Sequence, residues 1–352
     1  MKEANRYFLG SNSKYGFRSI FREILDSDEG NRLYIIKGGP GSGKSTLMKR
    51  VAEKFLADGD EVEIFPCSSD PDSLDGVLSK TKGVAMCDGT APHVVDAAYP
   101  GAFETVINTG DGFDIKRLSK FKKAIKDINA EIAGCHARAT EYIKAAALLR
   151  EQSFNTAKEF INEDAVQTLA DILPYKKRLK SGGKQYKRLL SAVTVGRIAL
   201  MDDTLCNQSL VYGINDPYGA AADRLLLKIK EHGDAVGAET VTCSCSIIPE
   251  KTEHLIFPEA STAFTTVNAF HRFISSDMQM VDSMYMPFSE EVKSRLDFEQ
   301  RTAKQLIERA AAEVKSAKEK HDILEGYYIS AMDFSVVDRL YDKIVSETAH
   351  LE

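Results

Sequence analysis

The sequence predicts an α/β fold that is built twice along the chain. Each copy is expected to be a mostly parallel sheet sandwiched by helices and followed by a long helical arm. Three observations lead to this prediction. Residues 32–59 read as a strand, a glycine-rich loop and a helix, residues 210–226 repeat that order, and a helix with a long apolar seam follows each unit. Strands that alternate with helices in this way are typical of parallel sheets.

Length and composition are those of a globular protein with more than one core. The chain has 352 residues, of which 43% are hydrophobic and 28% charged. Its net charge of −6 argues against a nucleic-acid binder, and no apolar run is long enough for a membrane span. The first residues, MKEANRYFLGSNS, lack the apolar stretch of a secretory signal, which predicts a cytoplasmic protein with free thiols.

The strongest motif is GGPGSGKST at 38–46, which matches the P-loop pattern. RLYIIK at 32–37 predicts the strand before it, and apolar residues at helical spacing predict a helix that ends at Gly59. In such a loop the glycines let successive N–H groups surround a phosphate, and the helix dipole adds to the attraction. The predicted nucleotide-binding residues are Gly38, Gly39, Pro40, Gly41, Ser42, Gly43, Lys44, Ser45, Thr46 and His93.

Within this motif, Lys44 is expected to supply charge to the β- and γ-phosphates, and the Ser45 hydroxyl to bind Mg²⁺. The next apolar strand, 84–88, ends at Asp88, which is the position of a second Mg²⁺ ligand. His93 follows, and either contacts a phosphate or is a structural histidine.

A polar stretch, CSSDPDSLDG at 67–76, follows the strand EVEIFP and brings together Asp70, Asp72 and Asp75. Ligands bind at the carboxyl ends of strands in open α/β sheets. One of these carboxylates is therefore a candidate to orient a water molecule or to accept a proton. The alternative is a polar turn, and the sequence does not choose among the three aspartates.

A second copy of the loop lies at 214–222, and it lacks the residues that carry the chemistry. Adding 176 to the residue number pairs the two copies, with a shift of two residues later on. The pairs are Gly43 with Gly219, Lys44 with Ala220, Ser45 with Ala221, Thr46 with Ala222, Cys67 with Cys243, Asp88 with Thr266 and His93 with His271. The second copy has lost its lysine, its hydroxyl and its metal carboxylate, so Mg–nucleotide binding is expected in the first copy alone.

Each half is predicted to end in a helical hairpin whose apolar seam runs over 118–149 or 303–331, with return segments at 157–173 and 334–347. These arms either cover the sheets or bind a protein partner or a second copy. The predicted first half is 1–175, with a core at 1–112 and an arm at 113–172. A basic linker at 176–188 precedes the second half, 189–352, with a core at 189–287 and an arm at 288–348.

A resemblance supports this organisation. On the motifs RYFLGSNSKYG, KGGPGSGKSTLMK, CSSDPDSLDG, DGTAPHVVD, YPGA and HDILEGYYISAMDFS, the chain resembles a family of uncharacterised bacterial P-loop ATPases with two tandem P-loop halves. The resemblance covers the whole chain and implies a duplicated P-loop NTPase fold that binds nucleotide. Residues 214–222 and Thr266 depart from the family, whose members keep an intact loop in both halves.

The predicted function is Mg²⁺-dependent ATP binding and hydrolysis at a single site. One alternative is a kinase that transfers the γ-phosphoryl group to a small acceptor near the acidic stretch. Another is a nucleotide-gated interaction protein that signals through its arms. The chain has no N-K-x-D guanine motif, which favours ATP over GTP. Arg224 and Arg272 of the second half are the candidates for a charge supplied to the first site.

Overall fold

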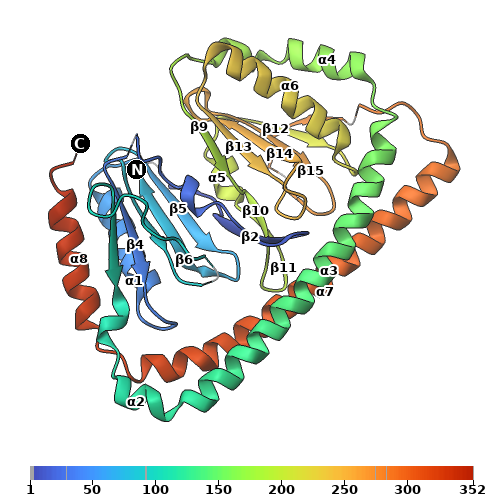
Figure 1. Cartoon of the computed structure of the whole chain (residues 1–352). Helices are drawn as coiled ribbons and strands as arrows, with labels where there is room; N and C mark the ends of the chain where they lie inside the picture. The colour runs from blue at the N-terminus through green and yellow to red at the C-terminus, as the bar shows by residue number, and fades with distance from the viewer. Residues whose placement is uncertain (1–3, 29, 92, 274, 283, 352) are drawn as a thin grey trace.

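The structure, a computed structural model, describes residues 4–28, 30–91, 93–273, 275–282 and 284–351. It is an α/β fold built on two six-stranded mixed sheets in which most neighbouring strands are parallel (Figure 1). The first sheet has the order β1 (Asn5–Arg6), β5 (Val62–Cys67), β6 (Asp70–Ser79), β7 (Val84–Asp88), β4 (Arg32–Lys37) and β8 (Glu104–Asn108). The second has the order β9 (Gln185–Arg188), β13 (Thr240–Ser244), β14 (Thr252–Phe257), β15 (Thr262–Val267), β12 (Leu210–Asn215) and β16 (Gln279–Val281).

The two sheets repeat one topology. In each, the first pairing is parallel, the next two are antiparallel and the last two are parallel. Each half also has a separate two-stranded hairpin, β2 (Gly10–Ser13) with β3 (Gly16–Ser19), or β10 (Ser191–Thr194) with β11 (Arg197–Leu200). The chain therefore contains the same arrangement of strands twice, in agreement with the matches between its halves.

The helix after each loop is amphipathic and covers its sheet. α1 (Lys44–Ala57) buries Leu47, Met48, Val51 and Phe55. Its counterpart α6 (Ala220–Val236) ends at Gly237, whose positive φ of 68° terminates the helix. A short helix, α5 (Asp202–Cys206), precedes β12. The predicted strand at 32–37 and the predicted helix that follows the first loop are both confirmed.

The two long helices pair with each other. α3 (Lys122–Lys158), which follows the short α2 (Ile115–Lys120), runs antiparallel to α7 (Glu290–Ile329) along one edge of the molecule (Figure 1). Ion pairs cross the seam, including Lys320 Nζ with Glu131 Oε2 at 2.7 Å. The buried residues of the seam are Ala139, Ile143, Ala146, Ala147, Ala303, Ile307, Ala310, Ala311 and Val314.

The predicted hairpin within each half is therefore wrong, since each long helix takes its partner from the other half. The return helices are too short to cover seams of this length: α4 (Glu163–Ile172) has 10 residues and α8 (Ser335–Thr348) has 14, against 37 and 40 for α3 and α7. Two long seams of similar length bury more apolar surface against each other.

The return helices also cross over. α4 packs on α6 of the second half, and α8 packs on α1 of the first half. Tyr34 of β4 donates to Glu347 Oε2 at 2.7 Å, and Val337 and Ile344 of α8 belong to the core that α1 covers. Each core is thus completed by a helix that follows the other half's long helix.

The halves share a core where they meet. Phe8 and Leu189 exchange two backbone hydrogen bonds, of 2.7 and 3.2 Å, inside an apolar cluster drawn from both sheets. The predicted basic linker, 176–188, is corrected here, because its end forms β9 at the edge of the second sheet. Arg188 is fully buried, and its charge is met by Glu63 Oε2 at 2.9 Å and by the Glu23 carbonyl at 2.7 Å.

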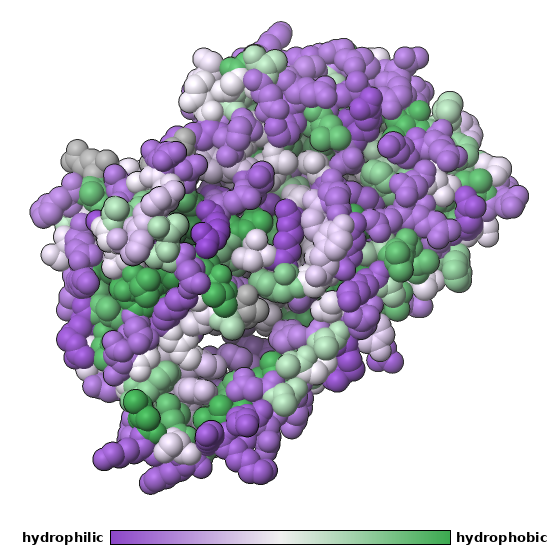
Figure 2. All heavy atoms as spheres, in the orientation of Figure 1, coloured by the Kyte–Doolittle hydropathy of each residue, from purple (hydrophilic) through white to green (hydrophobic). Residues whose placement is uncertain are grey.

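Hydrophilic residues cover most of the face seen in Figure 2, and the surface is hollowed between the first sheet and the long helices. Among the helices of the described residues, none is both long and apolar enough to cross a membrane.

Candidate functional site

The loop Gly38–Thr46, called the first loop below, connects the carboxyl end of β4 to the start of α1. Its backbone favours glycine, as Gly38 and Gly43 show. A Cβ on Gly38 would lie 2.2 Å from Thr109 Oγ1, and Gly43, which caps α1, has a φ of +84°. Ser42 lies inside the turn and bonds to the Gly39 carbonyl at 2.8 Å. The loop is therefore a tight turn that ends at a helix N-terminus, an arrangement whose N–H groups can bind an anion.

Lys44 lies across this loop. Its Nζ donates to the carbonyls of Gly38 at 3.1 Å and Gly39 at 2.9 Å, and lies 3.6 Å from Asp88 Oδ2. Asp88 comes to this position because it ends β7, beside Ile36 of β4. The motif lysine and the strand-end aspartate, which are distant in sequence, are thus paired at the predicted place.

Ser45 and Thr46 open α1 in different surroundings. The Ser45 Oγ accepts a 2.9 Å hydrogen bond from the backbone N–H of Leu74 in β6, whereas Thr46 is exposed. Asp88 Oδ1 accepts from Thr90 N at 2.8 Å, which leaves Oδ2 facing Lys44. A hydroxyl and a carboxylate oxygen are ligands that Mg²⁺ accepts.

The three candidate aspartates, Asp70, Asp72 and Asp75, differ in burial and in their partners. The stretch 67–76 is mostly strand β6 rather than an open loop, because the apolar residues that follow pair with β7. Asp72 is exposed, and Asp70 bonds to Ser73 at 2.9 Å and pairs with Lys318 of α7 at 3.3 Å. Asp75 is buried, and burial and the neighbouring Asp88 carboxylate raise the pKa of its carboxyl to about 8. Of the three, Asp75 is the one placed beside Asp88.

His93 is a buried partner of Asp75. Its Nε2 lies 3.6 Å from Asp75 Oδ2, and its ring stacks on Phe21 with centroids 4.6 Å apart. Burial lowers the pKa of the imidazole to about 4, so the ring is neutral at pH 7. Cys67 lies close by: its thiol, the Asp75 carboxyl and the imidazole offer three ligand atoms within 4.8 Å of one another.

The second loop, 214–222, is filled by a side chain of the chain itself. The fully buried Asp216 carboxylate accepts hydrogen bonds from the N–H groups of Tyr218 and Gly219, each at 2.9 Å, and of Ala222 at 2.8 Å. The Tyr285 hydroxyl, 2.9 and 3.0 Å from the same two oxygens, completes the set. These are the backbone donors that an anion at this helix N-terminus would use, and a carboxylate already holds them.

Strand register corrects one match between the halves. Ile36 lies opposite Asp88 and Ile214 opposite Thr266, so these positions differ by 178 rather than 176. The second loop is two residues shorter, which gives 176 at Gly43 and Gly219, and the segment from Gly219 to β13 is two residues longer than that from Gly43 to β5, which restores 178. The pairings of β5, β6 and β7 and of β13, β14 and β15 extend the 178 spacing, so Cys67 corresponds to Cys245, and not to Cys243.

At that spacing Asp75 corresponds to Glu253 and His93 to His271, and the second pair is also in contact. His271 Nε2 lies 3.0 Å from Glu253 Oε2. Here a buried arginine of α3 is present as well, since Arg150 Nη2 lies 3.3 Å from Glu253 Oε1. Burial alone would raise the pKa of the Glu253 carboxyl, but His271 and Arg150 outweigh it and lower the pKa to about 2.

The first loop is covered by the end of α7 and the start of α8, which sequence reasoning assigned no role. A Cβ on Gly39 would lie 3.2 Å from the Tyr328 ring, one on Gly41 2.8 Å from Ile329, and one on Gly43 2.8 Å from Val337. This segment lies within the motif HDILEGYYISAMDFS and just beyond it. The motif draws attention to this segment, but no spacing in the sequence predicts that the segment contacts the first loop.

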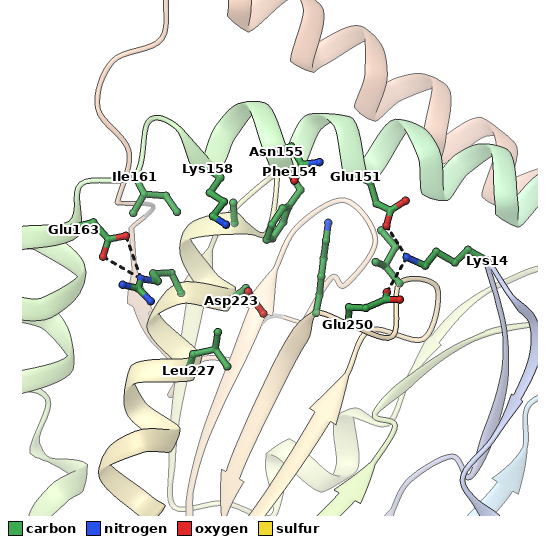
Figure 3. A pocket seen from close by; sticks show the side chains of 14 residues that line it. Lys14, Glu151, Phe154, Asn155, Lys158, Ile161, Glu163, Asp223, Leu227 and Glu250 are labelled. Carbon is green, nitrogen blue, oxygen red and sulfur yellow. Dashed lines mark hydrogen bonds and ion pairs between the residues drawn. The ribbon is translucent and has the colours of Figure 1, made fainter.

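A cavity of about 630 Å³ lies between α3 and α6 (Figure 3). Lys14 lies there between Glu151 and Glu250, and Arg224 bonds to Glu163 with its Nε 3.1 Å from both carboxylate oxygens. Arg272 lines a different cavity, beside Arg197 and Glu308. The idea that Arg224 or Arg272 supplies a charge to the first loop is therefore wrong; Lys318 is the cation that α7 brings to the acidic stretch.

Fold and site together define an α/β protein with two like sheets, one of which carries a glycine loop with a lysine inside it. A family model described as Nephrocystin 3, N-terminal, matches residues 17–81, a segment that runs from β3 through the first loop and α1 to β6. This segment is similar to that family. No curated protein and no solved structure matches the chain.

Proposed function

We propose that the chain is a P-loop NTPase with one competent site, which binds and hydrolyses Mg–ATP at Gly38–Thr46. The observation that carries the proposal is the position of Lys44, held in the loop at the start of α1 and 3.6 Å from Asp88 Oδ2. When phosphates enter the loop, the ammonium would move from the loop carbonyls to the β- and γ-phosphate oxygens. Ser45 and Asp88 would hold Mg²⁺, which would offset the negative charge of the phosphates.

The second copy would take no nucleotide. Asp216 holds three backbone N–H groups of the second loop, and Ala220 and Ala221 stand at the positions of Lys44 and Ser45. A phosphate would have to displace a buried carboxylate without gaining a lysine in exchange. The duplicated fold is in this proposal a pair of P-loop units, one active and one filled from within.

Calorimetric titration of the full chain with Mg²⁺ and a non-hydrolysable ATP analogue tests the proposal. We expect one site per chain, lost in Lys44→Ala and kept in Lys49→Ala, the same substitution at an exposed lysine of the same helix. Two sites per chain, no binding at all, or unchanged binding in Lys44→Ala would contradict it. Phosphate release, measured with and without small hydroxyl and carboxylate acceptors, then separates an ATPase from a kinase.

One observation favours a second role, in which nucleotide state is passed to the other half. The first loop touches Tyr328 and Ile329 in the last turn of α7. The other end of α7 begins just after Phe288, which packs against the core of the second sheet. Phosphate binding that shifts the loop would therefore move α7. Hydrogen exchange in 320–335, measured with and without the analogue in wild type and Lys44→Ala, tests this. Protection by nucleotide in wild type alone is expected, and equal exchange in all four samples would refute it.

A further inference from the structure

The two halves carry a thiol, a carboxyl and an imidazole at corresponding places. Adding 178 takes Cys67 to Cys245, Asp75 to Glu253 and His93 to His271, so each half has a thiol, a carboxyl and an imidazole. In both halves the carboxyl and the imidazole are buried and in contact, at 3.6 Å in the first and 3.0 Å in the second. The Cys67, Asp75 and His93 set is called the first cluster below, and its counterpart the second cluster.

In the second cluster a cation belongs to the chain itself. The Arg150 guanidinium is buried, with Nη2 3.3 Å from Glu253 Oε1 and Nη1 3.6 Å from Cys245 Sγ, and it lies over the Phe270 ring. A buried carboxylate needs such a partner, because a lone charge away from water is strongly unfavourable.

The first cluster has a different arrangement at the corresponding place. Each of two bridges joins a residue before one long helix to a residue after the other: Phe113 with Met332, and Tyr285 with Ile161. Phe113 therefore corresponds to Tyr285 and Ile161 to Met332, at spacings of 172 and 171 residues. At these spacings Arg150 corresponds to His321 or Asp322 of α7. His321 is 39% exposed and lies 3.9 Å from Glu325 instead. Within the described residues, no lysine or arginine pairs with Asp75, and neither Asp75 Oδ2 nor His93 Nδ1 has a hydrogen-bond partner.

The donor set and its spacing fit a metal ion. Thiolate, imidazole and carboxylate are the ligands of zinc and similar borderline ions, whereas Mg²⁺ prefers oxygen alone. Bonds of about 2.0–2.3 Å put neighbouring ligand atoms of a tetrahedral site about 3.3–3.8 Å apart. The His93 Nε2 to Asp75 Oδ2 distance is 3.6 Å, and all three ligand atoms lie within 4.8 Å of one another.

We propose that Cys67, Asp75 and His93 bind a divalent transition-metal ion of the zinc class, which takes the place that the Arg150 guanidinium has in the second cluster. This site is separate from the Mg²⁺ site proposed at Ser45 and Asp88. Three protein ligands leave a fourth position for water or substrate, as catalytic zinc sites do. Asp75 is then a metal ligand rather than the base sought among the three aspartates.

Cobalt(II) titration of the full chain, without nucleotide, tests the site. We expect one equivalent to bind with visible absorption of tetrahedral form and a thiolate-to-cobalt band, and added Zn²⁺ to displace it. Cys67→Ser should lose the thiolate band, and His93→Gln should weaken binding at least tenfold. Cys245→Ser is the matched control, because its thiol belongs to the cluster that Arg150 fills, and it should bind as wild type does. No binding by wild type, or equal loss in Cys67→Ser and Cys245→Ser, would overturn the proposal.

A second measurement needs no variant and so does not depend on how the variants fold. Zn²⁺ should slow the alkylation of Cys67 by iodoacetamide, followed by mass spectrometry of the digested chain, and leave the exposed Cys206 unchanged. Equal rates at Cys67 with and without Zn²⁺ would refute the site. Both experiments omit nucleotide, so their failure is distinct from failure of the proposed ATPase.

Discussion

The Tyr285 hydroxyl lies 2.9 and 3.0 Å from the two carboxylate oxygens of Asp216, and it also accepts the Ala221 N–H at 3.0 Å. Burial and the Asp216 charge raise the pKa of this hydroxyl above its ordinary value, so it remains a donor. The two side chains together occupy the helix N-terminus of the second loop. The loop keeps the anion-binding geometry of its counterpart and satisfies it from within the chain.

Replacing Asp216 should free the backbone N–H groups of the second loop to bind an added anion. Each buried donor left without an acceptor costs about 1–3 kcal/mol, so Asp216→Ala should lower the midpoint of thermal unfolding by several degrees. Inorganic phosphate should raise the midpoint of this variant more than that of wild type. Asp202→Ala, at an exposed position, is the control and should change neither value. The same phosphate effect in all three proteins would show that Asp216 does not stand in for an anion.

Asp88→Asn tests the proposed Mg²⁺ ligand. The amide keeps the size of the side chain and removes the charge that faces Lys44, so we expect folded protein whose Mg²⁺-dependent ATP turnover falls about 100-fold or more. Asp72→Asn, at an exposed carboxylate of the nearby acidic stretch, should leave turnover within about twofold. A stable Asp88→Asn protein with full activity would mean that another group holds the ion.

Ile344→Ala tests whether α8 completes the first core. Ile344 is fully buried in the cluster that α1 covers, so its truncation should cost about 2–5 kcal/mol of the free energy of unfolding. Ile323→Ala on α7, where the side chain is 59% exposed, should cost about 0.5 kcal/mol or less. Urea unfolding followed by circular dichroism compares them. If the two variants lose equal stability, α8 does not support this core.

His254, whose buried ring lies against His271 of the second cluster, predicts a pH dependence of stability. Burial and the His271 ring lower the pKa of His254 to about 3, below the ordinary value of 6.5. Between these values the unfolded chain binds a proton that the folded chain does not, so stability should fall as pH is lowered from about 6.5 toward 3. His254→Asn should show a flatter decline between pH 6.5 and 5, because the other groups that titrate there, Asp75 among them, are the same in variant and wild type. Parallel curves for variant and wild type would exclude His254 as a cause.

Local features could be predicted from sequence because they depend on neighbouring residues. β4, the first loop, α1 and the strand that ends at Asp88 were all found from apolar spacing and one motif. Three features could not be found in this way. The apolar seams of α3 and α7 show that each helix packs against another helix, but they do not identify that helix. The spacing of 176 taken from the loops missed the two extra residues between the second loop and β13, and so paired Cys67 with the wrong cysteine. Asp216 lies in a loop whose sequence alone resembles an ordinary turn.

The crossing of the return helices has a consequence for how the chain is made. A ribosome produces α1 early and α8 after every other element that the structure describes, yet α8 covers α1. While the intervening chain is synthesised, the apolar surface that α8 will cover on the first core stays open to water or to a chaperone. The first loop also lacks its neighbours Tyr328 and Ile329 until then. A nascent chain stopped before α7 would carry the complete motif without the side chains that cover it, so the first loop would reach its final surroundings only when synthesis is nearly over.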